Sequence, residues 1–181
     1  MANADRPRGA SAVRHLNGGT QIPINPYTVD ASNATAIFLG DFVAAEADGN
    51  VAPAAAAGVI LGVMVGVKDG YDDLSARYLA ATTAGTVYVV DDPSMIFEIQ
   101  EDDGGTALTA AARGANVEIV AGAGSTTTSK SAHELDQDSV TALTAQLRLL
   151  RLAERSNNDY GDNADWEVLI NEHAYNTAAG V

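Results

Sequence analysis

The stretch GTVYVVDDPSMIFEIQEDDGG, residues 85–105, contains two runs that favour β-strands, separated by Asp92-Pro93. The first run is rich in valine. In the second, residues 96–100 alternate between two faces, with phenylalanine and isoleucine together on one of them. β-Branched and aromatic residues with a period of two are typical of strands, and Asp-Pro favours a turn. The stretch therefore predicts two consecutive strands joined by a tight turn.

Similar runs lie on both sides of this stretch. They are short, rich in β-branched residues and bounded by Gly, Asp and Asn, with turn signals at Asp48-Gly49-Asn50 and Asp69-Gly70. About five to seven short strands at intervals of roughly 8–20 residues predict an antiparallel barrel or sandwich. The runs are residues 36–49, 58–70, 78–81, 115–124 and 164–176.

Two periodicities overlap in residues 133–155. Apolar residues from Val140 to Leu150 follow helical spacing, whereas the end of the segment also alternates as a strand would. We expect a short helix through about residue 144, followed by a strand. The predicted fold is mainly β: a small antiparallel β-barrel or sandwich, β-tulip-like, with an extended N-terminal arm and one short helix.

The composition indicates a folded chain with an acidic surface. Apolar residues make up 46% of the 181 residues and charged residues 19%, which is typical of a globular domain with its own core. The net charge of −14 argues against binding nucleic acid or an anionic membrane surface, because both require clustered Lys and Arg. The chain has no cysteine, which excludes disulfides and thiol catalysis.

One uncharged run, residues 51–67, has some features of a membrane-spanning helix. Its glycines at positions 58, 62 and 66 have the spacing of paired membrane helices. However, the run is shorter than the roughly 20 residues that a span requires, and Pro53 interrupts it. We expect a buried strand near the glycines. The N-terminus has no apolar segment of the kind that directs secretion.

The first 36 residues differ in character from the rest. Three of the ten basic residues, Arg6, Arg8 and Arg14, lie in the first fourteen positions, against one acidic residue. Prolines and glycines interrupt the segment, and no continuous apolar face runs through it. We therefore divide the chain into an extended arm, residues 1–36, and a compact β-domain, residues 37–181. Either the body or a partner is expected to hold the arm in place.

No segment carries a complete catalytic or metal-binding pattern. GSTTTSKS, residues 124–131, is similar to a P-loop, but serine replaces the second glycine, and we expect a surface loop. His133 beside Glu134 is expected to be a solvated loop pair, and His173 a packed or solvated strand residue. The loop Asn157–Asp165 holds three carboxylates that could bind calcium, without the order of an EF-hand. We expect no enzymatic activity and no cofactor.

Three segments together carry a family resemblance: MANADRPRGASAVRHLNGG at residues 1–19, the strand pair at residues 85–105, and NNDYGDNADWEVLINEHAYN at residues 157–176. Their order resembles the capsid decoration proteins of tailed bacteriophages, also called cement or head-stabilising proteins. The resemblance implies an arm that lies on the outer capsid surface of the virion and a β-domain above it. It also implies synthesis in the host cytoplasm and assembly as a homotrimer, with a dimer as the alternative.

On this interpretation, the partner is the major capsid protein, and neither nucleic acid nor membrane is bound. The arginines of the arm would pair with acidic groups of the shell, because the planar guanidinium binds carboxylates in a bidentate manner. The prolines would lower the entropy that the arm loses on docking. The expected capsid-contact residues are Arg6, Pro7, Arg8, Arg14, His15, Leu16, Pro23, Pro26 and Tyr27.

Two other functions stay open at this point. The chain could be an accessory binding module of a phage head or tail that attaches to a host surface or glycan, although its single tryptophan, Trp166, argues against a sugar-binding platform. It could also be a small hydrolase-like β-protein that uses His133 or the Asn157–Asp165 loop. Binding to capsids would distinguish capsid decoration from the accessory binding module. Catalytic turnover that depends on pH would identify the hydrolase-like protein.

Overall fold

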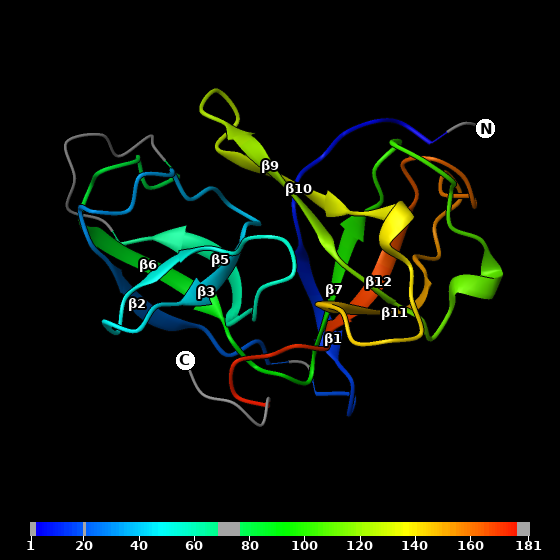
Figure 1. The fold of residues 1–181 in the computed structure, drawn as a ribbon, viewed down its shortest axis with the longest axis horizontal. Coiled ribbons are helices and arrows are strands. Elements are labelled where there is room, and N and C mark those ends of the chain that lie inside the picture. The colour runs from blue at the N-terminus through cyan, green and yellow to red at the C-terminus, as the bar shows by residue number, and fades with distance from the viewer. Residues whose placement is uncertain (1–2, 20, 69–76, 177–181) are drawn as a thin grey trace.

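The computed structural model describes residues 3–19, 21–68 and 77–176, and its fold is mainly β (Figure 1). Antiparallel strands form two five-stranded sheets and one two-stranded sheet in a sandwich-like arrangement, and no closed barrel is present among the described residues. The strands are β1 (Ser11–His15), β2 (Asn25–Val29), β3 (Phe42–Ala45), β4 (Val51–Pro53), β5 (Gly62–Val67), β6 (Gly85–Val90), β7 (Met95–Gln100), β8 (Asn116–Val117), β9 (Ile119–Ser125), β10 (Lys130–Leu135), β11 (Leu147–Leu152) and β12 (Asp165–Ile170).

The first sheet has the order β1-β7-β12-β11-β8, and β7 and β12 were both predicted from alternation. On one face Phe97, Ile99, Trp166 and Val168 are fully buried. On the other face Glu98 of β7 lies directly opposite a glutamate of β12. The period of two therefore separates an apolar face from a charged face, as expected for a half-buried antiparallel sheet.

The second sheet has the order β2-β6-β5-β3-β4, and it contains the uncharged run at residues 51–67 as β4 and β5. The predicted buried strand near the glycines is confirmed. Position 62 requires glycine for a steric reason, because a Cβ there would lie 2.3 Å from the carbonyl oxygen of Val90 on the neighbouring strand. In the described part of the chain, no helix is long and apolar enough to cross a membrane. The predicted turn at Asp69-Gly70 lies outside the described residues.

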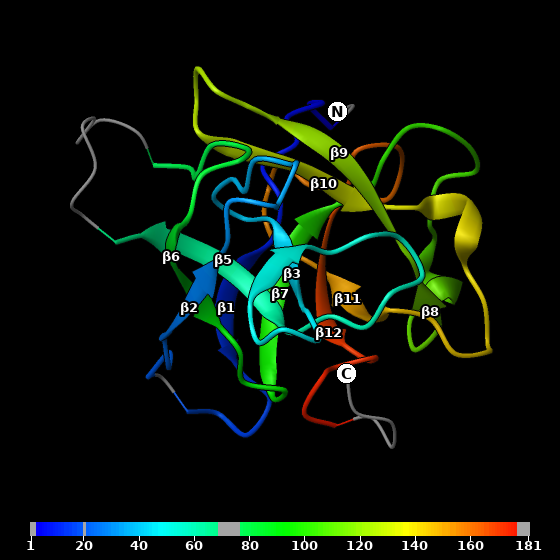
Figure 2. The same cartoon turned by 60° about the vertical axis from the view of Figure 1, so that its left-hand side comes forward.

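Strands β9 and β10 form a hairpin that projects beyond both sheets (Figures 1 and 2). The expected surface loop at residues 124–131 is wrong in part, because only residues 126–129 form a turn and β10 begins at Lys130. Strand β10 is tied to the body by bridges from Lys130 to Leu39 and from Leu135 to Glu101. A strand follows the turn where a P-loop has a helix, so the segment cannot form a phosphate-binding loop of that kind.

One apolar core joins the two sheets and the hairpin. Phe42 of the second sheet packs edge-to-face on Phe97 of the first, with ring centroids 6.4 Å apart. The hairpin contributes Ile119 and Leu135 to the same core. A smaller core lies within the second sheet. Because the main core draws on both sheets, neither sheet is an independent unit.

The prediction for residues 133–155 is half right. The strand is confirmed as β11, but the helix through about residue 144 is wrong. Helical structure is limited to the short 3₁₀ helices η1 (Ala110–Ala112) and η2 (Gln137–Ser139) in the described part of the chain. Asp136 caps η2 by accepting a hydrogen bond from the Asp138 N–H. The leucines of β11 match helical spacing, but they belong to a strand that pairs with β12 and β8.

The N-terminal 36 residues are not a separate arm in this structure. Strand β1 pairs with β7 at the edge of the first sheet, and β2 pairs with β6 at the edge of the second. The body of the protein therefore holds this segment. The boundary expected between residues 36 and 37 falls in the connection from β2 to β3, and the same segment contributes to both sheets.

Gly9 provides a test of how tightly the segment before β1 is packed. Its φ is +69°, and a Cβ there would lie 2.3 Å from the carbonyl oxygen of Gly40 and 2.4 Å from the Cβ of Ser131. We expect Gly9→Ala to lower the free energy of unfolding by about 3 kcal/mol, measured by urea denaturation. At Gly18, φ is +83° and no described atom lies within 4 Å of where a Cβ would be, so Gly18→Ala should cost only about 1 kcal/mol. Equal losses would show that contact at Gly9 is unimportant.

Candidate functional site: the groove beside the N-terminal segment

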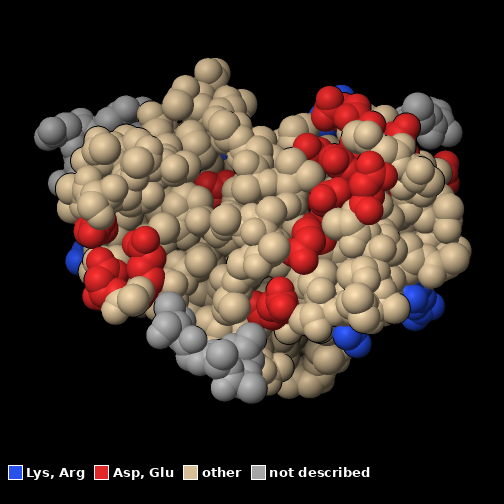
Figure 3. All heavy atoms as spheres, viewed as in Figure 1, with Lys and Arg blue, Asp and Glu red and all other residues tan. Residues whose placement is uncertain are grey.

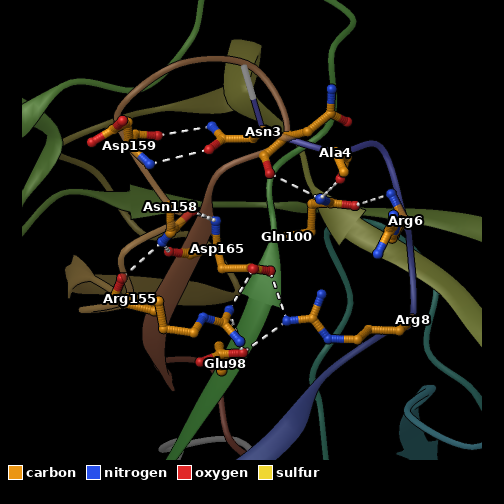
Figure 4. A network of polar contacts seen from close by, with 12 residues as sticks. Asn3, Ala4, Arg6, Arg8, Glu98, Gln100, Arg155, Asn158, Asp159 and Asp165 are labelled. Atoms are coloured by element: carbon orange, nitrogen blue, oxygen red, sulfur yellow. Dashed lines mark hydrogen bonds and ion pairs between the residues drawn. The ribbon is translucent and has the colours of Figure 1, made fainter. Parts of the chain in front are cut away.

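Ion pairs fasten the N-terminal segment to the charged face of the first sheet (Figure 4). The Arg8 guanidinium donates to Glu98 at 2.7 Å and to Asp165 at 2.8 Å. Arg155 approaches the same two carboxylates from the other side, at 2.8 Å from Glu98 and in direct contact with Asp165. Two arginines thus share two carboxylates, which fixes the position of the chain just before β1.

A second group of charged side chains lies on the same face of the sheet, around Glu167 of β12. Glu167 of β12 accepts hydrogen bonds from Arg14 at 2.7 Å and from Arg151 at 2.9 and 3.0 Å. Burial opposes ionisation of Glu167, but the two arginines hold its pKa below the usual value. Because Glu167 lies directly opposite Glu98, the arginines also offset repulsion between like charges on neighbouring strands.

Neutral hydrogen bonds fasten the first residues further. The Asn3 side-chain amide donates to the carbonyl oxygens of Asp159 at 2.8 Å, Asp162 at 3.1 Å and Gly161 at 3.3 Å. The Gln100 amide donates to the Ala4 carbonyl at 2.8 Å and accepts from the Arg6 N–H at 2.9 Å. These contacts join the N-terminal segment to the loop before β12 and to the end of β7.

A groove of about 360 Å³ lies between the two sheets and beside this segment. Ala12 lines it on the first sheet, Ala10 lies just before that strand, Met64 and Val65 line it on the second, and the walls are mostly apolar. Ile22 and Ile24, in the connection from β1 to β2, complete the rim, together with Lys130 and with Arg8, whose charge is balanced by Glu98 and Asp165. The groove therefore combines an apolar wall with the positive charge of Lys130 on a strongly acidic protein.

Several large exposed apolar side chains lie on the N-terminal segment, and two of them, Ile22 and Ile24, line this groove. Val13, Leu16, Ile22 and Ile24 are 38–58% exposed, and all four fall within residues 13–24. Val65, across the groove, is 37% exposed. Exposed apolar side chains gathered in one region indicate an interaction surface, whereas single ones do not.

The predicted capsid-contact residues lie at several places in and around this region. Arg8 and Arg14 already have carboxylate partners within the chain, so they are not free as the hypothesis of direct pairing with a shell assumed. Arg6 and Pro7 are exposed, Leu16 is 58% exposed, Pro23 is half-buried, and Pro26 is exposed on β2.

The two remaining predicted residues have partners inside the protein. His15 is buried, with its Nδ1 3.6 Å from Asp92 and its Nε2 against the Gln21 carbonyl. The Tyr27 hydroxyl donates to Asp91 at 2.5 Å and contacts the Tyr175 hydroxyl. Burial and the neighbouring Asp91 carboxylate raise the pKa of Tyr27. Both residues serve to hold the segment rather than to present a surface.

His133 is buried, so the expected solvated pair with Glu134 is wrong. Its Nδ1 accepts the Phe42 N–H at 3.2 Å, and its Nε2 faces the Asp41 carboxylate at 3.6 Å. Burial lowers the pKa of His133 and raises that of Asp41, each partly offset by the other. The pair borders a second cavity, of about 540 Å³, lined mainly by alanine and glycine. His173 is fully buried, which confirms that it is packed.

The loop Asn157–Asp165 is organised by hydrogen bonds to its own chain. Asn158 donates to the carbonyl oxygens of Ala153 and Asp165, and the Asp165 carboxylate binds arginines. Among the residues that the structure describes, no three His, Asp or Glu side chains are arranged to hold a metal ion. The carbonyl oxygens that converge in this loop face the amide of Asn3.

Compared with protein-family models, with curated proteins and with solved structures, the chain shows no match. The groove, the ion pairs and the buried carboxylates are therefore the observations from which a function is argued.

Glu101, which the sequence did not single out, is fully buried beside the only tryptophan. Its Oε2 accepts the Trp166 indole N–H at 2.8 Å, and its Oε1 has no hydrogen-bond partner among the described residues. Burial raises the pKa of Glu101 to about 8, although the indole hydrogen bond lowers it. The carboxyl group is therefore protonated in the folded protein at neutral pH.

This proton makes stability depend on pH. An unfolded Glu101 ionises near pH 4.5 and the folded one near pH 8, so the folded state binds more protons between these values and stability falls as pH rises through them. We expect Glu101→Gln to raise the melting temperature at pH 8.5 by at least about 5 °C relative to the native chain, and to change it little at pH 4. Melting followed by Trp166 fluorescence measures this. An equal effect at both pH values would contradict the protonated carboxyl.

Proposed function

We propose that this chain is a non-enzymatic virion protein that binds the outer surface of a tailed-phage capsid and clamps neighbouring major capsid proteins, stabilising the expanded head. The order of sequence segments that resembles decoration proteins suggests this function. The observation that carries it is the groove, with its exposed Ile22 and Ile24 on the N-terminal segment. That segment is the one for which the resemblance implies capsid contact.

The groove favours an extended, partly acidic segment of the capsid protein as its occupant. Apolar side chains of such a segment would cover Ile22 and Ile24, and acidic groups would approach Lys130, which lies at the border of the groove. Ser11 and Ala12 of β1, a strand at a sheet edge, also line the groove. An extended peptide placed beside an exposed edge can add backbone hydrogen bonds to side-chain contacts.

The mechanism is mechanical. Pressure from packaged DNA pulls capsomers apart, and a protein bound across their seams adds binding free energy that must be overcome before rupture. Each contact can be weak, because many copies act together on one shell. Acidic side chains outside the groove would face solvent, where like charge keeps particles apart (Figure 3).

The alternative of a glycan-binding module receives less support. Stacking on sugars uses exposed aromatic faces, and Trp166 is fully buried in the core. Tyr160 and Tyr175 are exposed, but Tyr175 contacts Tyr27 and lies on a different segment from Tyr160. Attachment to capsids is therefore the function that we test.

Co-sedimentation with expanded heads that lack this protein tests the proposal. We expect saturable binding by the native chain, and at least a tenfold loss of affinity for Ile22→Asp/Ile24→Asp, because charge is placed on the apolar rim of the groove. Leu143→Asp is the matched control: Leu143 is 77% exposed but lies far along the chain in the connection to β11. Thermal melting confirms that each variant folds.

Two results would contradict the proposal. Absence of binding by the native chain would exclude capsid decoration and favour another partner. Equal losses for the groove variant and Leu143→Asp would remove the groove from the contact. Replacing Arg8 and Arg14 with alanine separates the two modes of attachment: loosening of β1 should weaken binding, whereas direct pairing with the shell would also flatten its salt dependence.

A further inference from the structure

One long strand edge has no partner strand among the described residues. Strand β9 pairs there with β10 alone, although it is seven residues long. The opposite edge of β10 is occupied, because Leu39 bonds to the backbone of Ser129 and Ser131, and Asp102 bonds to Leu135. The hairpin is thus closed on one side, and on the other it is open beyond Ile119, whose N–H donates to Gln146 Oε1 at 3.1 Å.

Space for another chain lies along this open edge. The cavity of about 540 Å³ is lined by four consecutive residues of β9, Ala121, Gly122, Ala123 and Gly124. Consecutive strand residues point to opposite faces, so a space that touches all four runs along the edge of the strand. Segments 34–36 and 53–55 form the other wall. Phe38, Asp41 and His133 of β10 also line the cavity, so the space extends over one face of the hairpin as well.

Asp41 and His133 border the same cavity as a buried pair. Asp41 is only 2% exposed, and its Oδ1 lies 3.6 Å from the Nε2 of His133. Its Oδ2 accepts the Phe38 N–H at 2.7 Å. Both groups are therefore held by contacts within the chain.

The hairpin also carries an uncharged run in a very acidic chain. Residues 119–129, IVAGAGSTTTS, contain no charged side chain, whereas the whole protein carries a net charge of −14. The projecting hairpin accordingly lacks charged groups on the face shown in Figure 3. Two copies of this protein repel one another over most of their surfaces, but not here.

We propose that the open edge of β9 is a self-association site, where β9 of a second copy adds antiparallel about a two-fold axis at Ala123. Identical edges pair naturally in this way, and the small alanine and glycine residues allow close approach. This association does not depend on capsid binding.

Single cysteines test this geometry, because the native chain has none. Ala121→Cys and Ala123→Cys each place one thiol on an exposed position of β9. In an antiparallel pair, opposed Cβ atoms lie roughly 4.5–5.5 Å apart, close to the distance that a disulfide spans. We expect at least one variant to form disulfide-linked dimers under mild oxidation, and Ala111→Cys, exposed on η1, to remain at least tenfold slower.

Analytical ultracentrifugation of the full chain provides the second measurement. Native protein should dimerise with rising concentration, Ala123→Asp should shift the equilibrium at least tenfold towards monomer, and Ala111→Asp should not. A monomer at all concentrations would overturn the proposal. So would a dimer or trimer that neither β9 cysteine links, since its interface would lie elsewhere.

The two proposals fail separately. Head binding by a chain that stays monomeric would overturn association through β9 and leave capsid decoration standing. Cross-linking through β9 without head binding would support association through β9 and overturn capsid decoration. If a capsid strand rather than a second copy occupied the edge, Ala123→Asp would abolish head binding while native protein alone stayed monomeric, and self-association would be wrong.

Discussion

The pairing of Glu98 with Glu167 across the centre of the first sheet is the constraint on which the N-terminal half of the structure depends. Their strands bring two carboxylates opposite each other, on a protein that is already strongly acidic. Arg8, Arg14 and Arg151, together with Arg155, offset that repulsion through direct hydrogen bonds. The basic start of an acidic chain thus has a local cause: it neutralises the charged face on which it lies.

This constraint also places the groove. Because Arg8 and Arg14 hold β1 against β7, the chain must cross from the first sheet to the second before it forms β2. The crossing exposes Leu16, Ile22 and Ile24, which have no core to enter. The proposed partner surface lies where the chain passes between two sheets, and its stability depends on ion pairs that are partly exposed and sensitive to salt.

Alternation predicted most of the strands, since β6, β7 and β12 have a buried face that local sequence records. It did not predict β1 and β2, because an edge strand such as Ser11–His15 buries little and carries no apolar stripe. The helix predicted near Val140 is wrong because the leucines of the following strand match the periods of both a helix and a strand. The site residues Ile22, Asp41 and Glu101 gave no local signal, because their roles come from contacts made far along the chain.

The edges of the sheets differ in how they are protected. Strand β1 carries Arg14 and a shift in register, β2 contains Pro26, β4 is three residues long and contains Pro53, and β8 has two residues. Charges, prolines and short length are the usual means by which proteins prevent strands from pairing with other chains. Strand β9 contains no charge and no proline, and it is the longest of the twelve strands in the described part of the chain, although its pairing with β10 also contains a register shift. Charge, proline or short length thus protects four edges and not the fifth, which is expected if β9 pairs with another chain.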